Sequence, residues 1–159
     1  MFGIGALAFA AGGIAPISKP SQTNNEFTVK LFFVRLNDDG KIGPKIGCGD
    51  SLVSMDVPVL SAPTPDGALI SLFAIKDREY GTSKLYNALS QANLSVSSVT
   101  ITDGVANVVL TGQLSLGGVC DSPRVKAQIE ETVKQFPGIT TVKTTINGKD
   151  VDIVLSGKG

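Results

Sequence analysis

Few residues in this chain have types and spacings suited to covalent or metal chemistry. Its 159 residues include no histidine, which removes the most common general base and the most common zinc ligand together. Adjacent carboxylates, a pattern that can support acid–base hydrolysis, occur at Asp38-Asp39 and at Glu130-Glu131. The first pair falls in a predicted turn and the second on the water-facing side of a predicted helix. We therefore predict that the protein is not an enzyme and has no catalytic, metal-binding or cofactor-binding residues.

The two cysteines, Cys48 and Cys120, are the other reactive side chains. Each lies in a glycine-rich stretch, where backbone freedom lets two sulfur atoms approach. They are far apart in sequence and neither forms a Cys-x-x-Cys pair, so the spacing does not indicate zinc binding or redox catalysis. Two alternatives remain: a disulfide, which an oxidising compartment favours, or two buried thiols. The disulfide requires the two Cα atoms to lie within about 7 Å.

The start of the chain bears on that compartment. Residues 1–17 are uncharged and mostly apolar, and Ala8-Phe9-Ala10 has the small-x-small form of a signal cleavage site. The run is shorter than the roughly 20 residues of a spanning helix, and no basic residue precedes it. We expect an export or anchor segment here, followed by a polar linker at 18–26. The alternative is an apolar tail without a targeting role.

Charge is balanced along the chain. Fourteen basic residues offset fourteen acidic ones, and the lysines are scattered. A nucleic acid or an anionic membrane would need a concentrated basic face, which the sequence does not contain. We expect no nucleic-acid partner and expect membrane contact only through residues 1–17.

The elements that must position these residues follow from hydrophobic period and turn signals. Thr64 and Pro65 mark one helix start, Ser122 and Pro123 another, and Asp103-Gly104 a tight hairpin turn. The predicted helices are 65–76, 83–91 and 122–136, and the predicted strands are 27–36, 51–60, 96–102, 105–110, 139–146 and 151–155. Together they predict one α+β domain over 27–156, with a mixed sheet of about six strands and two main helices packed on it.

Several of these segments resemble the GerMN domain, a module named from a spore-germination lipoprotein and found in bacterial envelope proteins. The matching segments are Leu31-Phe32-Phe33-Val34, the helix at 67–73, the hairpin at 99–106, Gly117-Gly118-Val119-Cys120, the helix and turn at 125–138, and Ile146-Asn147-Gly148-Lys149. The resemblance implies an exported or anchored domain of the bacterial envelope, related to sporulation proteins and without enzymatic activity. It implies contacts with other proteins, without naming a ligand.

These observations predict a binding domain outside the cytoplasm whose partner is another envelope protein or a second copy. We expect its docking surface to be the closing strand, at Val151, Ile153 and Leu155, which would pair with a strand of the partner. One alternative is a module for a small molecule or cell-wall glycan, with a pocket lined by Phe73, Tyr80 or Tyr86. A second is a small hydrolase, which would bring carboxylates or a serine–lysine pair together in a cleft.

Overall fold

Two β-sheets enclose two helices in the computed structural model of the protein, which describes residues 27–157. The first sheet has the order β2-β3-β1-β5-β4 and consists of β1 (Phe27–Arg35), β2 (Lys45–Ile46), β3 (Asp50–Val59), β4 (Glu79–Tyr80) and β5 (Leu85–Tyr86). The second sheet has the order β6-β7-β8-β9 and consists of β6 (Asn93–Thr102), β7 (Val105–Gln113), β8 (Thr141–Ile146) and β9 (Lys149–Asp150). The predicted segments 1–17 and 18–26 lie outside the described residues.

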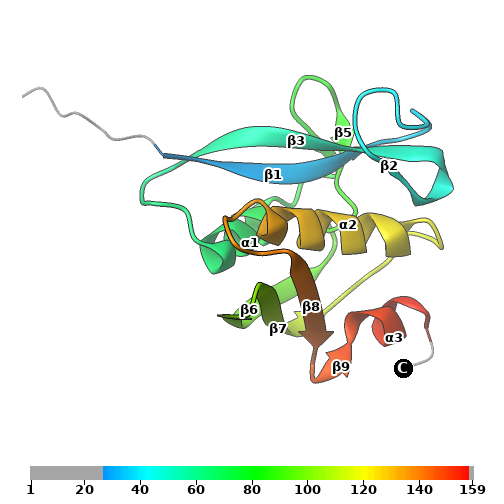
Figure 1. Ribbon diagram of the computed structural model, residues 1–159. Helices are drawn as coiled ribbons and strands as arrows, with labels where there is room; N and C mark the ends of the chain where they lie inside the picture. The colour runs from blue at the N-terminus through cyan, green and yellow to red at the C-terminus, as the bar shows by residue number, and fades with distance from the viewer. Residues whose placement is uncertain (1–26, 158–159) are drawn as a thin grey trace, which may run out of the picture.

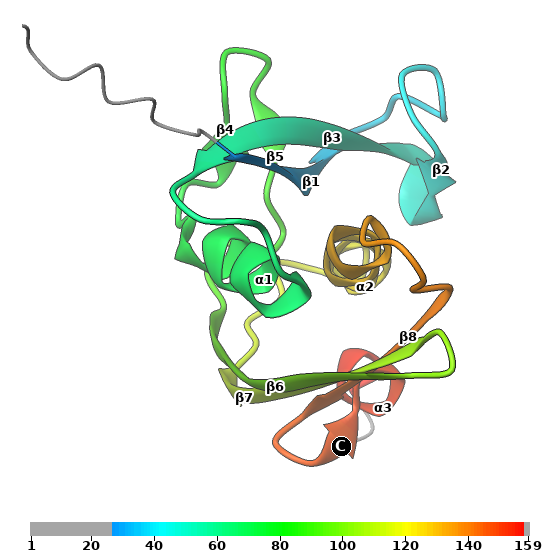
Figure 2. The same ribbon diagram turned by 60° about the vertical axis from the view of Figure 1, so that its left-hand side comes forward.

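The helices form the middle layer of the molecule. Helices α1 (Pro65–Ala74) and α2 (Asp121–Lys134) lie between the two sheets, and the short helix α3 (Val151–Leu155) follows β9 at one side (Figures 1 and 2). A single turn of 3-10 helix, η1 (Gly47–Gly49), precedes β3. The α+β class and the single compact domain are confirmed, whereas the predicted single sheet is wrong because its strands are divided between two sheets.

The hairpin of the second sheet forms where the sequence predicts it. Asp103 and Gly104 take φ values of 50° and 78°, the left-handed conformations that a tight two-residue turn requires. β7 then runs parallel to β8, and α2 provides the crossover between them. The second sheet is therefore mixed, as predicted for the whole domain.

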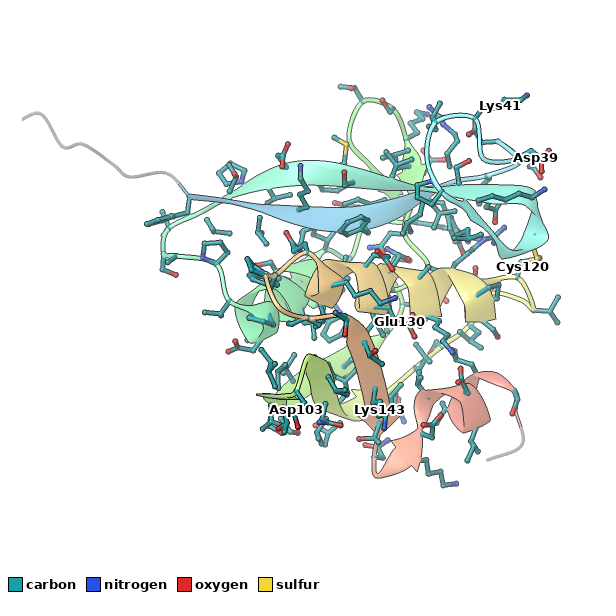
Figure 3. All side chains as sticks on the ribbon, viewed as in Figure 1. Asp39, Lys41, Asp103, Cys120, Glu130 and Lys143 are labelled. Atoms are coloured by element: carbon teal, nitrogen blue, oxygen red, sulfur yellow. A yellow bond between two sulfur atoms is a disulfide. The ribbon has the colours of Figure 1, made fainter. Side chains whose placement is uncertain are left out.

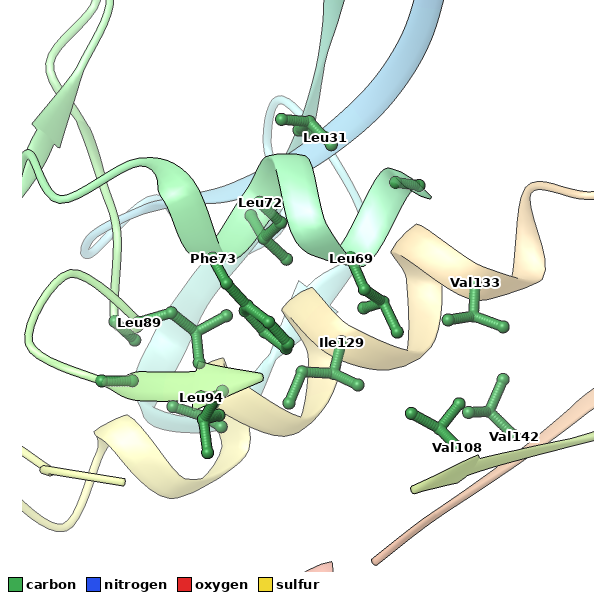
Figure 4. Packing of buried hydrophobic residues seen from close by; sticks show 14 of the residues in the cluster. Leu31, Leu69, Leu72, Phe73, Leu89, Leu94, Val108, Ile129, Val133 and Val142 are labelled. Atoms are coloured by element: carbon green, nitrogen blue, oxygen red, sulfur yellow. The ribbon is translucent and has the colours of Figure 1, made fainter. Parts of the chain in front are cut away.

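The buried core joins all three layers. In Figure 4, Phe73 of α1 lies beside Ile129 of α2 and Leu94 of β6, while Val133 faces the second sheet. Both helices bury apolar side chains, because each is covered by sheet on two sides. This arrangement explains the error in sheet number: hydrophobic period shows that a strand is buried, but not which sheet it joins.

The two helix starts differ from each other. Thr64 caps α1 as predicted, since its Oγ1 accepts a hydrogen bond from the Gly67 N–H at 3.2 Å. The predicted cap of α2 by Ser122 is wrong. Cys120 occupies the N-cap position without a side-chain cap, and Ser122 Oγ instead donates to the Leu155 carbonyl at 2.9 Å.

The predicted closing strand at 151–155 is also wrong, because these residues form helix α3. The Asp150 carboxylate accepts a hydrogen bond from the Asp152 N–H at 2.8 Å and caps a helix after only two residues of β9. Val151 is buried, whereas Ile153 on the opposite side of the turn is 49% exposed. Val151, Ile153 and Leu155 therefore do not form a strand edge. Among the described residues, no helix has the length and apolar character needed to span a membrane.

The predicted helix at 83–91 is replaced by β5 and turns. Asn87 is fully buried, and its side chain donates to the Ile75 carbonyl and accepts from the Leu89 N–H. An asparagine that bonds nearby backbone groups in this way competes with helix formation.

Candidate functional site

The two cysteines form a disulfide. Cys48 and Cys120 have Cα atoms 5.9 Å apart, and the bond joins the η1 turn before β3 to the start of α2. Of the two alternatives that the sequence leaves open, the disulfide is confirmed. It leaves neither sulfur as a thiol, so these cysteines act as a covalent link between the first sheet and the middle layer.

A buried charged cluster lies near this bond. Arg124 Nε donates to Asp50 Oδ2 at 2.6 Å, and Arg124 Nη1 donates to Asp121 Oδ1 at 3.1 Å. Asp50 is fully buried and also accepts a bond from the Asn37 N–H. Burial alone would lower the pKa of Arg124, but its bonds to the two carboxylates raise that pKa above the ordinary value.

Tyr86 completes the cluster. Its hydroxyl donates to both oxygens of Asp121 at 2.9 and 3.0 Å, and Asp121 Oδ2 also accepts from the Gly117 N–H. Burial raises the pKa of Tyr86, and the neighbouring Asp121 carboxylate raises it further. Each carboxylate oxygen of Asp50 and Asp121 thus has a donor. This pairing fits a structural role in joining β3, β5 and α2, because no reactive carboxylate is left over.

The three residues of the predicted pocket are separated. Phe73 is packed in the core, Tyr80 stacks on Phe33 with ring centroids 4.2 Å apart, and Tyr86 belongs to the charged cluster. Phe73 and Tyr86 each line a different hollow. The structure therefore does not bring Phe73, Tyr80 and Tyr86 to one ligand site.

Two hollows of the described part of the chain bear on the predicted hydrolytic site. The smaller one, of about 90 Å³, has Arg78, Tyr86 and Asp121 in its lining, and the Tyr86 hydroxyl and the Asp121 carboxylate are hydrogen-bonded to each other. A broad hollow of about 660 Å³ lies between the end of β7 and β9, and Lys149 is its single ionisable lining residue. Figure 3 shows Asp39 and Glu130 far from each other, on a loop of the first sheet and on α2. Within residues 27–157 no three metal-ligating side chains lie close enough to hold an ion.

The edges of the two sheets provide a different candidate. β1 pairs with β3 along its whole length, but on its other side it pairs with β5 only at Val34. Side chains from α2 and its C-cap bond the β1 backbone at two further positions on that side, Lys30 and Phe32. Gln135 accepts from the Lys30 N–H and donates to the Lys30 carbonyl, and Gln128 donates to the Phe32 carbonyl. Two glutamine side chains thus take the place of a neighbouring strand.

The outer side of β3 is protected by other means. β2 pairs with its first residues, Asp50 and Ser51, and the Leu52 N–H donates to the Pro44 carbonyl. Further along, the strand carries Asp56 and Pro58, both exposed. A charged residue and a proline on an edge strand both disfavour pairing with another chain.

β6 lacks the covering side chains, the charge and the proline that protect the first sheet, and the irregularity in it is a register shift between Val96 and Ser98. It is the outermost strand of the second sheet and ten residues long, and it contains no charged residue, proline or glycine. The charged residues labelled on this sheet in Figure 3 lie elsewhere, with Asp103 in the hairpin turn and Lys143 on β8. β6 is therefore a long, uncharged strand with one side open to pairing.

An apolar hollow lies at one end of the same edge, beside residues 94–96. It has a volume of about 370 Å³ and lies between α1 and β6, lined by Ile70, Phe73, Ala74, Leu94, Ser95 and Val96. Ile70 on α1 is 56% exposed and Ile101 on β6 is 52% exposed. In an extended segment added to β6, the side chains that point to the helix side opposite residues 94–96 would be directed toward this hollow.

The family described as "Germane: Sporulation and spore germination" matches residues 30–152. The chain belongs to this family. The match covers both sheets and the two main helices, so it includes the covered edge of β1 and the open edge of β6. No curated protein matches the chain.

Two solved structures share the fold of this Germane domain. The tandem GerMN domains of the sporulation protein GerM from Bacillus subtilis align with 14% identity and a TM-score of 0.56, over 84% of this chain and 43% of that one. The first GerMN domain of the same protein aligns with 17% identity and a TM-score of 0.53, over 78% of this chain and 85% of that one. The chain thus spans less than half of the tandem structure, and at these identities the likeness establishes the fold alone.

Sequence reasoning missed the β6 edge of this Germane domain. It predicted the hairpin, but it could not tell which of the two strands would lie outermost. The composition gave no signal that singles out this strand, because residues 93–102 are part of a longer uncharged run over 85–102 and β7 is uncharged as well.

Proposed function

We propose that this Germane domain is a non-catalytic binding module of the bacterial cell envelope, located outside the cytoplasm. Its role is to hold an extended segment of a protein along the free edge of β6. The observation that carries the proposal is the contrast between this uncharged edge and the protected edges of the first sheet.

The backbone of β6 would provide affinity and the hollow would provide selectivity. Strand addition satisfies the free N–H and C=O groups of an edge strand, whatever the sequence of the added segment. The hollow beside it is apolar, with Ile70 and Phe73 on the α1 side and Leu94 on the strand side. A segment with alternating apolar and uncharged polar residues fits this surface, because its apolar side chains would enter the hollow.

Two features support a location outside the cytoplasm. The Cys48–Cys120 disulfide suits an oxidising compartment. Residues 1–17 have the apolar, uncharged composition of an export or anchor segment, and 18–26 that of a polar linker. The domain at 27–156 would then lie a short distance from a membrane surface.

The test places a photoreactive benzoylphenylalanine at Ile101 of the full chain, which is then incubated with an envelope-protein extract. Ile153 is the matched control position, because its exposed fraction is nearly the same and it lies on α3. We expect light-induced cross-links from position 101 to one protein segment and none from position 153. Cross-links from 153 alone, or from neither position, would overturn the proposal.

A further inference from the structure

We infer that the segment bound along β6 is the β6 strand of a second copy of this chain. The two strands would run antiparallel about a twofold axis between Ser97 and Ser98, and the two second sheets would become one continuous sheet. The inference rests on the proposed strand addition and names the partner.

The first step is the direction of the β6 side chains. Val96, Val99 and Ile101 lie opposite residues of β7 that are at most 1% exposed, namely Leu110, Val108 and Ala106. These three residues therefore point to the helix side of the sheet, together with the buried Leu94. The other paired residues of β6, which are serine, threonine or asparagine, alternate with them and point to the open side, and Ser97 is exposed and has no partner on β7.

The bulge in β6 makes this arrangement possible. Leu94 and Val96 are separated from Val99 and Ile101 by an odd number of positions, so a regular strand would place the two pairs on opposite faces. The register shift between Val96 and Ser98 inserts one extra residue, which returns all four to the same face. This irregularity lies at the middle of the strand, on the proposed axis.

In this register β6 is complementary to itself. Residues that are directly opposite each other in an antiparallel pair point to the same face. Across the proposed axis, the pairs on the helix side are Leu94 with Ile101 and Val96 with Val99, and those on the open side are Asn93 with Thr102, Ser95 with Thr100 and Ser97 with Ser98. Apolar residues thus meet apolar residues, and hydroxyl groups meet hydroxyl groups. With no charged residue in β6, two identical strands approach without like-charge repulsion.

The hollow beside α1 supports the same register. Ile101 points to the helix side of the sheet and is 52% exposed. Pairing places Ile101 of one copy opposite Leu94 of the other, and Leu94 lines the hollow with Ile70 and Phe73. Each copy would therefore supply its exposed Ile101 to the hollow of the other, so that the hollows of both copies would be filled.

The register is tested by mixing two single variants of the full chain, Ser95→Cys and Thr100→Cys, under mild oxidation. We expect a disulfide-linked dimer from the mixture and little from either variant alone, since two copies of position 95 would lie about 17 Å apart along the strand. Mixing Ser95→Cys with Thr102→Cys is the control for a register shifted by two residues. A dimer that forms equally in the control mixture, or in neither mixture, would overturn the inference.

Equilibrium sedimentation of the full chain gives a second, independent readout. Ile101→Lys places a charge at the seam and should weaken dimerisation at least about tenfold, while Ile153→Lys should leave it unchanged. A wild-type chain that stays monomeric at every concentration, or an Ile101→Lys variant that dimerises normally, contradicts the inference. If the chain is monomeric but its position 101 still cross-links to another protein, the self-pairing fails and the proposed function stands. If the chain is monomeric and position 101 gives no cross-link, both the self-pairing and the proposed function are contradicted.

Discussion

The edge strands of the two sheets differ in how far they are protected from pairing with another chain. In the first sheet, the backbone of β1 is bonded by Gln128 of α2 and by Gln135 directly after that helix, and the outer side of β3 carries Asp56 and Pro58. In the second sheet, β6 is longer than any other outer strand among residues 27–157 and carries neither a charge nor a proline. An edge strand without charge or proline is open to pairing with other chains, and this contrast between the two sheets is the basis of the proposed binding surface.

The groups that stabilise the fold and the surface proposed for binding lie on different sides of α2. The disulfide and the Arg124 cluster both lie on the first-sheet side of α2, where they connect β3 and β5 to the helix. The β6 side has uncharged polar groups on one face and an apolar hollow on the other. We therefore expect substitutions on the first side to change stability and those on the second to change association.

The largest effect on stability is expected from removing the disulfide. The double variant Cys48→Ser with Cys120→Ser opens a loop closed over a sequence separation of 72. The chain-entropy relation gives a loss of about 4 kcal/mol in the free energy of unfolding. Urea unfolding of the oxidised wild type and the double variant measures this loss. A loss below about 1 kcal/mol would show that the link is not a main support of the first sheet.

A smaller loss is expected when the covered side of β1 is opened. Gln128→Leu keeps a similar volume but leaves the Ala88 N–H and the Phe32 carbonyl without their partner in a fully buried position. Buried groups without partners cost about 1–3 kcal/mol each, so we expect a loss of about 3 kcal/mol by urea unfolding.

Gln135→Leu is the control for that variant, because Gln135 also bonds the β1 backbone but lies in a partly exposed position. Water can replace its bonds, and the expected loss is about 1 kcal/mol. Equal losses in the two variants would contradict the view that Gln128 covers a buried edge.

Removing the protection of β3 should convert it into a second open edge. In the double variant Asp56→Thr with Pro58→Val, the stability should change by less than about 1 kcal/mol, because the Lys30–Asp56 pair is on the surface. The association state should change instead, toward larger assemblies in sedimentation velocity runs. An unaltered association state would show that Asp56 and Pro58 are not what prevents β3 from pairing with another chain.

The smallest effect concerns the loop beside β2. Ser51 Oγ donates to Asp38 Oδ2 at 2.6 Å, and this bond, with that of the Ile42 N–H, lowers the pKa of Asp38 below its ordinary value. A lowered pKa means that the carboxylate supports the folded loop above the ordinary pKa, and that this support is lost as the pH falls through the lowered value.

Ser51→Ala should therefore raise the pKa of Asp38 toward its ordinary value, as followed by NMR titration of the carboxyl carbon. Ser54→Ala, at an exposed position of the same strand, is the control. An unchanged titration of Asp38 in the Ser51→Ala variant would remove the hydrogen bond as the cause.

Local signals in the sequence predicted much of this fold. The hairpin at Asp103-Gly104, the Thr64 cap and the apolar stripe of Val125, Ile129 and Val133 all depend on residues close in the chain, and all three are confirmed. The disulfide was one of two open alternatives, and the choice required the positions of two distant loops.

The wrong predictions concern segments whose structure is determined by contacts with residues far away in the sequence. Residues 151–155 alternate well enough for a strand, but a cap by Asp150 and the packing of Val151 make them a helix. The open edge of β6 could not be assigned, because outermost position depends on which strands pair with β7 on its other side. Tyrosine is a residue type common in ligand pockets, but the structural role of Tyr86 depends on its hydrogen bond to Asp121, 35 positions away.

Amide hydrogen exchange of the full chain at low and at high protein concentration tests the central claim most directly. The amides of β6 that do not pair with β7 should exchange fast in dilute solution and become protected as the concentration rises. The amides on the outer side of β3, from Val53 to Val59, should exchange at the same rate in both samples. Protection that grows at β3 and not at β6 would contradict the account.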